Sequence, residues 1–78
     1  MITEAEVIEA LRRALDVKGF NIESSVENTE EWDSLGSLTI FTTLSRLTNG
    51  YSDEIGGIAS MTTAKEIITA LKENEIIK

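Results

Sequence analysis

The sequence contains no cysteine, no histidine and no proline among its 78 residues. Without cysteine the chain forms no disulfide, has no thiolate metal site or thiol nucleophile, and fits a reducing compartment. Without histidine it lacks the commonest metal ligand and the commonest general base near neutral pH. A Ser-His-Asp arrangement is therefore excluded, and nothing in the spacing favours a Ser-Lys pair or a calcium loop. We expect neither an enzyme nor a metal site.

Long apolar runs are also missing, since no stretch is long enough to span a bilayer. The N-terminus shows no basic segment followed by an apolar one, so we expect no signal peptide and a cytoplasmic protein. A chain this short forms one domain, residues 1–78, and we expect a monomer with a thin margin of stability. Its formal net charge of -7 argues against nucleic acid and membrane as partners and favours proteins with basic patches.

Helix-period patterns dominate what the sequence does contain, and the first lies near the N-terminus. Thr3 and Glu6 match a capping box, in which each side chain bonds the backbone of the other residue. Apolar residues then recur at helical spacing and charged residues fall largely elsewhere. This pattern predicts an amphipathic helix over residues 3–17, with Gly19 as its C-terminal stop.

A second helix is expected to begin at Asp33, whose side chain is a good N-cap. It should end at Asn49-Gly50, because both residue types tolerate left-handed backbone angles. Its predicted apolar stripe consists of Leu35, Leu38, Ile40, Phe41, Leu44 and Leu47.

The remaining chain adds one more clear helix and two irregular stretches. Residues 19–32 read as a long loop, which in so small a domain is more often functional than not. Residues 51–61 contain at most a short helix, because Gly56-Gly57 opposes a long one. Thr63 caps a last helix over residues 63–74. We predict an all-α bundle of three main helices plus a short third helix, with a long loop between the first and second.

The most informative segment is Glu-Glu-Trp-Asp-Ser-Leu-Gly-Ser-Leu, residues 30–38. It places Ser34 in the first turn of the second helix, just after the Asp33 cap. A helix start has unpaired N–H groups and a partial positive charge, so a phosphate ester on Ser34 would be favoured there. We expect Leu35 and Leu38 to anchor this turn in the core while Ser34 points outward.

Asp33-Ser34-Leu35 at this place in a small acidic domain resembles the acyl carrier protein family. The resemblance covers nearly the whole chain, and residues 61–64, Met-Thr-Thr-Ala, are similar to the Ile-Thr-Thr-Val that opens the last helix of many carriers. It implies that coenzyme A donates 4'-phosphopantetheine to Ser34 and that the thiol of this arm carries acyl or aminoacyl groups as thioesters. It also implies that Asp33 and Leu35 assist the modifying enzyme.

The charge of the second helix departs from that family. Typical fatty-acid carriers bear acidic residues there, whereas this chain has none between Asp33 and Asp53. The resemblance therefore implies a specialised carrier, in a lipid, polyketide or other secondary-metabolite, or aminoacyl pathway. Its partners would be a phosphopantetheinyl transferase, a loading enzyme and a downstream synthase or transferase.

Three further residues around the motif are candidates for contact with these partners, namely Trp32, Gly36 and Leu38. A lone tryptophan in a loop also fits simple packing on the domain. The alternative function is an interaction module with a carrier-like fold that is never modified. A carrier needs the Ser34 hydroxyl, whereas such a module would tolerate Ser34→Ala.

Overall fold

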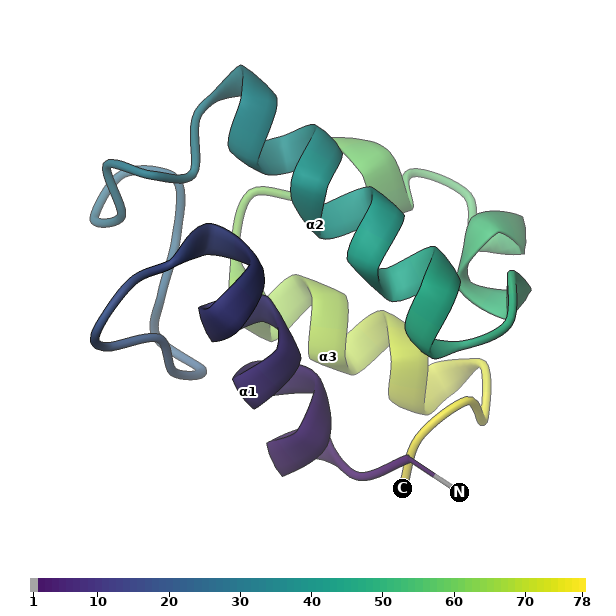
Figure 1. Cartoon of the computed structure of the whole chain (residues 1–78). Helices are drawn as coiled ribbons and strands as arrows, with labels where there is room; N and C mark the ends of the chain where they lie inside the picture. The colour runs from purple at the N-terminus through teal and green to yellow at the C-terminus, as the bar shows by residue number, and fades with distance from the viewer. Residues whose placement is uncertain (1) are drawn as a thin grey trace.

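A computed structural model describes residues 2–78 of the chain. Its helices, in order, are α1 (Glu4–Leu15), α2 (Ser34–Leu47), the 3-10 helices η1 (Tyr51–Glu54) and η2 (Ile58–Ser60), and α3 (Ala64–Glu73). Helix α1 runs opposite to α2 and α3, and the long connection from α1 to α2 lies at one end of the bundle (Figure 1). Within residues 2–78 no strand forms beyond two isolated bridges, which join Ile2 to Ile77 and Ser25 to Thr63. The predicted all-α bundle is confirmed.

Helix α1 starts as predicted and ends early. The Thr3 hydroxyl accepts the Glu6 N–H at 3.2 Å, and a Glu6 carboxylate oxygen accepts the Thr3 N–H at 3.1 Å, which completes the capping box. The helix ends at Leu15 because Asp16 adopts left-handed angles, with a φ of 56°. Aspartate tolerates this conformation better than most residues, so the predicted stop at Gly19 is wrong by several residues.

The stretch after α2 contains two short 3-10 helices rather than one helix. Asn49 and Gly50 end α2 with φ angles of 55° and 86°, as predicted from their residue types. The backbone turns left-handed again at Gly57, with a φ of 80°, and this turn separates η1 from η2. The prediction of a single short helix between the second and last helices is therefore wrong, because two short helices form there.

The core lies between α1, α2 and α3, where the buried apolar residues of the three helices meet. The least exposed of the larger aliphatic side chains on α1 and α3 are Val7, Leu11, Ile67 and Leu71. On α3 the apolar residues Ala64, Ile67, Ile68 and Leu71 are all buried. The core thus follows directly from the i, i+3, i+4, i+7 spacing of this helix.

The predicted stripe of α2 is wrong at its N-terminal end. Ile40 and Leu44 are buried, but Leu35 is 75% exposed and Leu38 is 62% exposed. At about 3.6 residues per turn, Leu35 lies about 2.5 turns before Leu44 and so faces the opposite side of the helix. Apolar residues at strict intervals of three, here four leucines and Phe41, drift around the helix, and only the later members of the run reach the core.

The two ends of the chain are held side by side (Figure 1). The bridge between Ile2 and Ile77 is parallel, and the Ile77 side chain is only 3% exposed. Lys72 of α3 also forms an ion pair with Glu4 of α1 at 2.8 Å. Across residues 2–78 the helices are too short or too polar for any of them to cross a membrane.

Candidate functional site

Ser34 is the first residue of α2 and its side chain is exposed. Asp33 precedes it in extended conformation as the N-cap, and its carboxylate accepts the N–H of Gly36 at 2.9 Å. The carbonyl of Asp33 also accepts the Ser37 N–H at 2.8 Å, which begins the regular helical ladder. The cap therefore fixes the helix start and leaves the Ser34 hydroxyl in solvent.

Trp32 lies two residues before Ser34 and is only 1% exposed. Its ring packs against Phe20 with centroids 5.9 Å apart, and its backbone N–H donates to the Thr29 carbonyl at 2.9 Å. The prediction that Trp32 contacts a partner is wrong, because almost none of its surface is accessible. The other interpretation, packing on the domain, is confirmed. The buried ring anchors the end of the long loop in the core and thereby fixes the backbone just before Ser34.

Gly36 lies two residues after Ser34 and is also buried. A Cβ atom added there would overlap the carbonyl oxygen of Glu31 and would lie 3.2 Å from a methyl carbon of Leu15. The prediction of a partner contact at Gly36 is therefore wrong as well. Gly36 allows the loop backbone and the end of α1 to press directly against the first turn of α2. A glycine inside a helix lowers stability relative to alanine. Its presence in the first turn of α2 was therefore a sequence signal of a close backbone contact at this position.

Leu35 and Leu38 form an exposed apolar pair beside Ser34. The expectation that they anchor the helix start in the core is wrong, since the buried Trp32 and Gly36 serve that purpose. Exposed leucines of this size next to a candidate attachment point are typical of a surface that another molecule covers. Leu38 thus remains accessible for the partner contact that the sequence suggests.

The loop before the site is held by a network that the sequence analysis did not identify. The Asn28 side chain accepts the Ser25 N–H at 2.8 Å and donates to the Glu23 carbonyl at 3.0 Å. Backbone bonds then tie the loop to the start of α3, from Val26 to Thr62 and from Ala64 to Ser24, each at 2.9 Å. Asparagine and serine in a loop signal such turns, but their partners depend on the fold.

The chemistry open to the site is that of an exposed primary hydroxyl at a helix start. Among residues 2–78 no side chain accepts or donates a hydrogen bond at the Ser34 hydroxyl. Because the chain has no histidine, a base that removes the hydroxyl proton would have to come from another molecule. The helix start offers unpaired N–H groups and a partial positive charge, which favour an anionic ester at this oxygen.

Comparison of the chain with protein-family models, with curated proteins and with solved structures gives no match.

Proposed function

We propose that the protein is a carrier that holds acyl or aminoacyl groups as thioesters on a 4'-phosphopantetheine arm attached to Ser34. The observation that supports this most directly is the placement of Ser34. Its side chain is exposed at the first residue of α2, while Trp32 and Gly36, two residues to either side, are buried. A hydroxyl held in this way is accessible to a modifying enzyme and lies between two residues that are packed into the domain.

The residues around Ser34 fit such a group. A phosphodiester on Ser34 would meet the free N–H groups at the start of a 14-residue helix. The exposed Leu35 and Leu38 would give the modifying enzyme an apolar contact. The bound group would supply a terminal thiol, a function that this chain without cysteine lacks. In the transfer, the Ser34 oxygen would displace the adenosine bisphosphate half of coenzyme A from phosphorus and lose its proton to a base of the transferase.

The charges of α2 favour a specialised pathway over general fatty-acid synthesis. No acidic residue occurs between Ser34 and Leu47, and Arg46 is the only charged side chain of this helix. Enzymes that recognise an acidic second helix would find no counter-charge here. We therefore place the protein in a specialised lipid, polyketide or aminoacyl pathway with its own loading enzyme.

The test is the intact mass of the protein after incubation with coenzyme A, magnesium and several phosphopantetheinyl transferases of broad specificity. The native chain and a Ser37→Ala control should each gain one phosphopantetheinyl group, and Ser34→Ala should gain none. Ser37 is the appropriate control because it is the next serine of the same helix. A gain at Ser34→Ala would place the attachment elsewhere.

An unmodified interaction module is the second candidate, and the exposed Leu35 and Leu38 favour it as much as they favour a carrier. It predicts no mass gain with any transferase on a chain that NMR shows to be folded. It also predicts that Ser34→Ala has no effect on binding to a natural partner. The mass experiment therefore separates the two functions.

A further inference from the structure

The arginines of this acidic protein are confined to two helices. Arg12 and Arg13 lie on α1 and Arg46 lies on α2, whereas all four lysines lie in other parts of the chain. Helix α2 has no acidic residue. Helix α1 also carries three glutamates, so the two helices together have no net charge. The residues that line the space between them include Arg13 and Arg46 but no acidic residue, although the chain has a formal net charge of -7.

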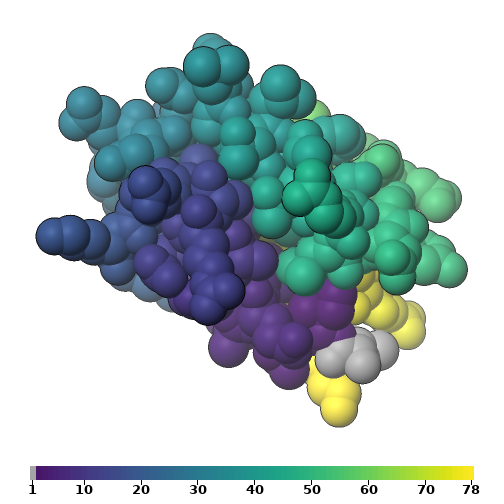
Figure 2. All heavy atoms as spheres, viewed as in Figure 1, coloured from purple at the N-terminus to yellow at the C-terminus, as the bar shows by residue number. Residues whose placement is uncertain are grey.

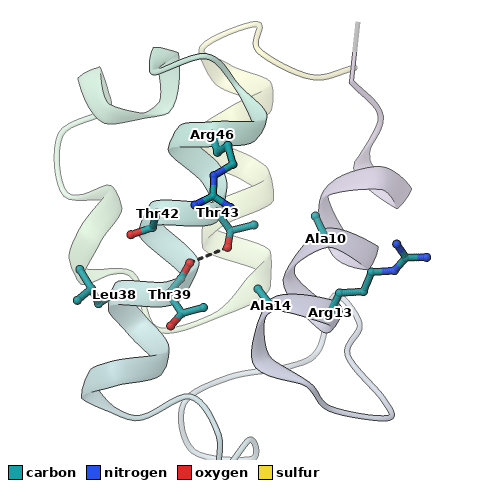
Figure 3. Close-up of a pocket in the computed structure, with 8 residues that line it drawn as sticks. All are labelled: Ala10, Arg13, Ala14, Leu38, Thr39, Thr42, Thr43 and Arg46. Carbon is teal, nitrogen blue, oxygen red and sulfur yellow. Dashed lines mark hydrogen bonds between the residues drawn. The ribbon is translucent and has the colours of Figure 1, made fainter.

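The surface shared by α1 and α2 is hollowed. A groove of about 550 Å³ runs between the two helices, with Ala10 and Ala14 of α1 on one wall and Leu38, Thr39 and Thr43 of α2 on the other (Figure 3). In the space-filling view the surface dips between the purple atoms of α1 and the teal atoms of α2 (Figure 2). Small side chains on both walls allow a third element to approach the two backbones closely.

The α2 wall of the groove is less polar than its composition indicates. The Thr39 hydroxyl donates to the Leu35 carbonyl at 2.9 Å, and the Thr43 hydroxyl donates to the Thr39 carbonyl at 2.7 Å (Figure 3). Since both donors are used within α2, these residues need no partner from outside. Together with Leu38 they make an apolar strip that suits the apolar face of a helix.

Two arginines, Arg13 and Arg46, line the groove, and both can accept a further carboxylate partner. The guanidinium of Arg13 points away from α2, toward the outer side of α1 (Figure 3). Arg13 bonds Glu9 at 3.0 Å, but its side chain is 76% exposed and it shares Glu9 with Arg12. Within residues 2–78 Arg46 takes part in no ion pair, and it is exposed. Its side chain extends along α2 toward Thr43, in the direction of the helix N-terminus (Figure 3). Glu9 thus serves two of the three arginines and Arg46 has no carboxylate partner, so a carboxylate from another molecule could pair with it.

We propose that the groove between α1 and α2 binds an amphipathic helix of a partner protein, with apolar residues on Leu38 and with aspartate or glutamate opposite Arg13 and Arg46. Arginine pairs with carboxylates through two parallel hydrogen bonds, which gives orientation as well as attraction. A nucleic acid or an anionic membrane is a poorer occupant, because an extended polyanion would also meet the acidic remainder of the surface. A helix with a few carboxylates meets only the arginines.

The arginines also fix the register of the partner. A separate recess beside Ala10 and Arg13 is lined by Glu6, Glu9 and Leu47. Partner carboxylates are therefore expected opposite the Arg46 guanidinium, which extends toward Thr43, and not beside Glu6 and Glu9 (Figure 3). Ser34, Leu38, Thr42 and Arg46 follow one another at intervals of four and are all exposed, so the bound helix would extend toward Ser34. The inference does not require that Ser34 be modified.

The experiment uses the full chain, labelled with ¹⁵N, and two synthetic amphipathic peptides with the same leucine face. One peptide carries glutamate beside that face and the other carries lysine at the same positions. The glutamate peptide should shift the amide signals of residues 10–15 and 38–47, and its affinity should fall as salt is added. The double variant Arg13→Glu/Arg46→Glu should weaken this binding at least tenfold.

The control is Lys18→Glu/Lys65→Glu, which changes the net charge by the same amount at two exposed positions outside the groove and should bind as the native chain does. All four substituted side chains are exposed, so both variants should keep the native spectrum. Three results would overturn the proposal. The glutamate peptide could cause no shifts of the groove amide signals, both double variants could weaken its binding equally, or the lysine peptide could shift the same amide signals. Shifts at these amides on concentrating the chain alone would also overturn it, since the occupant would then be a second copy.

Discussion

Gly36 is the residue on which the geometry around Ser34 depends most closely. Alanine at this position would press its Cβ into the Glu31 carbonyl and toward Leu15. In an ordinary helix interior the same change stabilises by about 0.5–1 kcal/mol. Here we expect Gly36→Ala to lower the free energy of unfolding by about 1–3 kcal/mol, because the loop or the helix start must shift.

Chemical denaturation of the two variants Gly36→Ala and Gly56→Ala checks this prediction. Gly56 is exposed, and a Cβ added there meets nothing within 4 Å. Its substitution should therefore change stability by no more than about 0.5 kcal/mol. Equal stabilities of the two variants would show that the contact between Glu31 and Gly36 is not as close in solution.

The side chain of Asp33 holds the first turn of α2 through a single hydrogen bond. Its carboxylate satisfies the Gly36 N–H, which otherwise has no partner inside the helix. Asp33→Ala should cost about 0.5–2 kcal/mol, whereas Asp33→Asn should keep most of the stability because an amide oxygen also caps. Hydrogen exchange at the amides of residues 35–37 measures the effect locally. Unchanged exchange in the alanine variant would contradict the capping role.

Within α1, the charges of Glu9, Arg12 and Arg13 form a small cluster whose titration can be observed. Hydrogen bonds from Arg12 at 2.8 Å, and also from Arg13 at 3.0 Å, lower the pKa of Glu9 from 4.5 to about 2. A lowered pKa in the folded state means that the cluster contributes stability above pH 4.5, and that the contribution disappears as the pH falls toward 2. The contribution is small, because the side chains are exposed to solvent.

The measurement is an NMR titration of the Glu9 carboxyl in the native chain and in Arg12→Gln. The pKa of Glu9 should rise toward its ordinary value in the variant, since the leading hydrogen-bond donor is lost. A native Glu9 that titrates near 4.5 would mean that the cluster does not form in solution.

The individual helices show which features of the fold the sequence predicts. Helices with an N-cap side chain and a regular apolar stripe, such as α3, were predicted almost residue by residue, because local hydrogen bonds and one buried face determine them. Helix α2 was predicted in extent, but its buried face was not. Its leucines and Phe41 recur at intervals of three, and only the packing against α1 decides which of them reach the core.

The candidate site divides in the same way. Asp33 and Ser34 follow local rules of helix capping, so their placement was predicted correctly. The roles of Trp32 and Gly36 depend on Phe20, Leu15 and the Glu31 backbone, which are brought to them only by the fold. The groove was not predicted for the same reason, because its two walls come from segments far apart in the sequence.

At the scale of the whole molecule, the contact between the first and last residues of the fold contributes much of a small free energy of unfolding. A domain of this length has a total stability of roughly 4–12 kcal/mol. Ile77 is almost fully buried and bridges Ile2. Ile77→Ala should cost about 2–5 kcal/mol and therefore a large part of that total.

Thermal unfolding of Ile77→Ala, with Lys78→Ala as the neighbouring control, checks this prediction. Lys78 is exposed, so its loss should leave the midpoint nearly unchanged. A small effect at Ile77 would mean that the last residues contribute little to the core.

The burial of Trp32 gives the molecule a spectroscopic reporter. It is the only tryptophan of the chain, so intrinsic fluorescence excited at the indole band arises from one known position. That position lies two residues from Ser34 and in contact with Phe20. Its emission should therefore be blue-shifted in the native state, and movement of the loop upon modification of Ser34 or occupation of the groove should appear as a change in colour or intensity, without any attached dye.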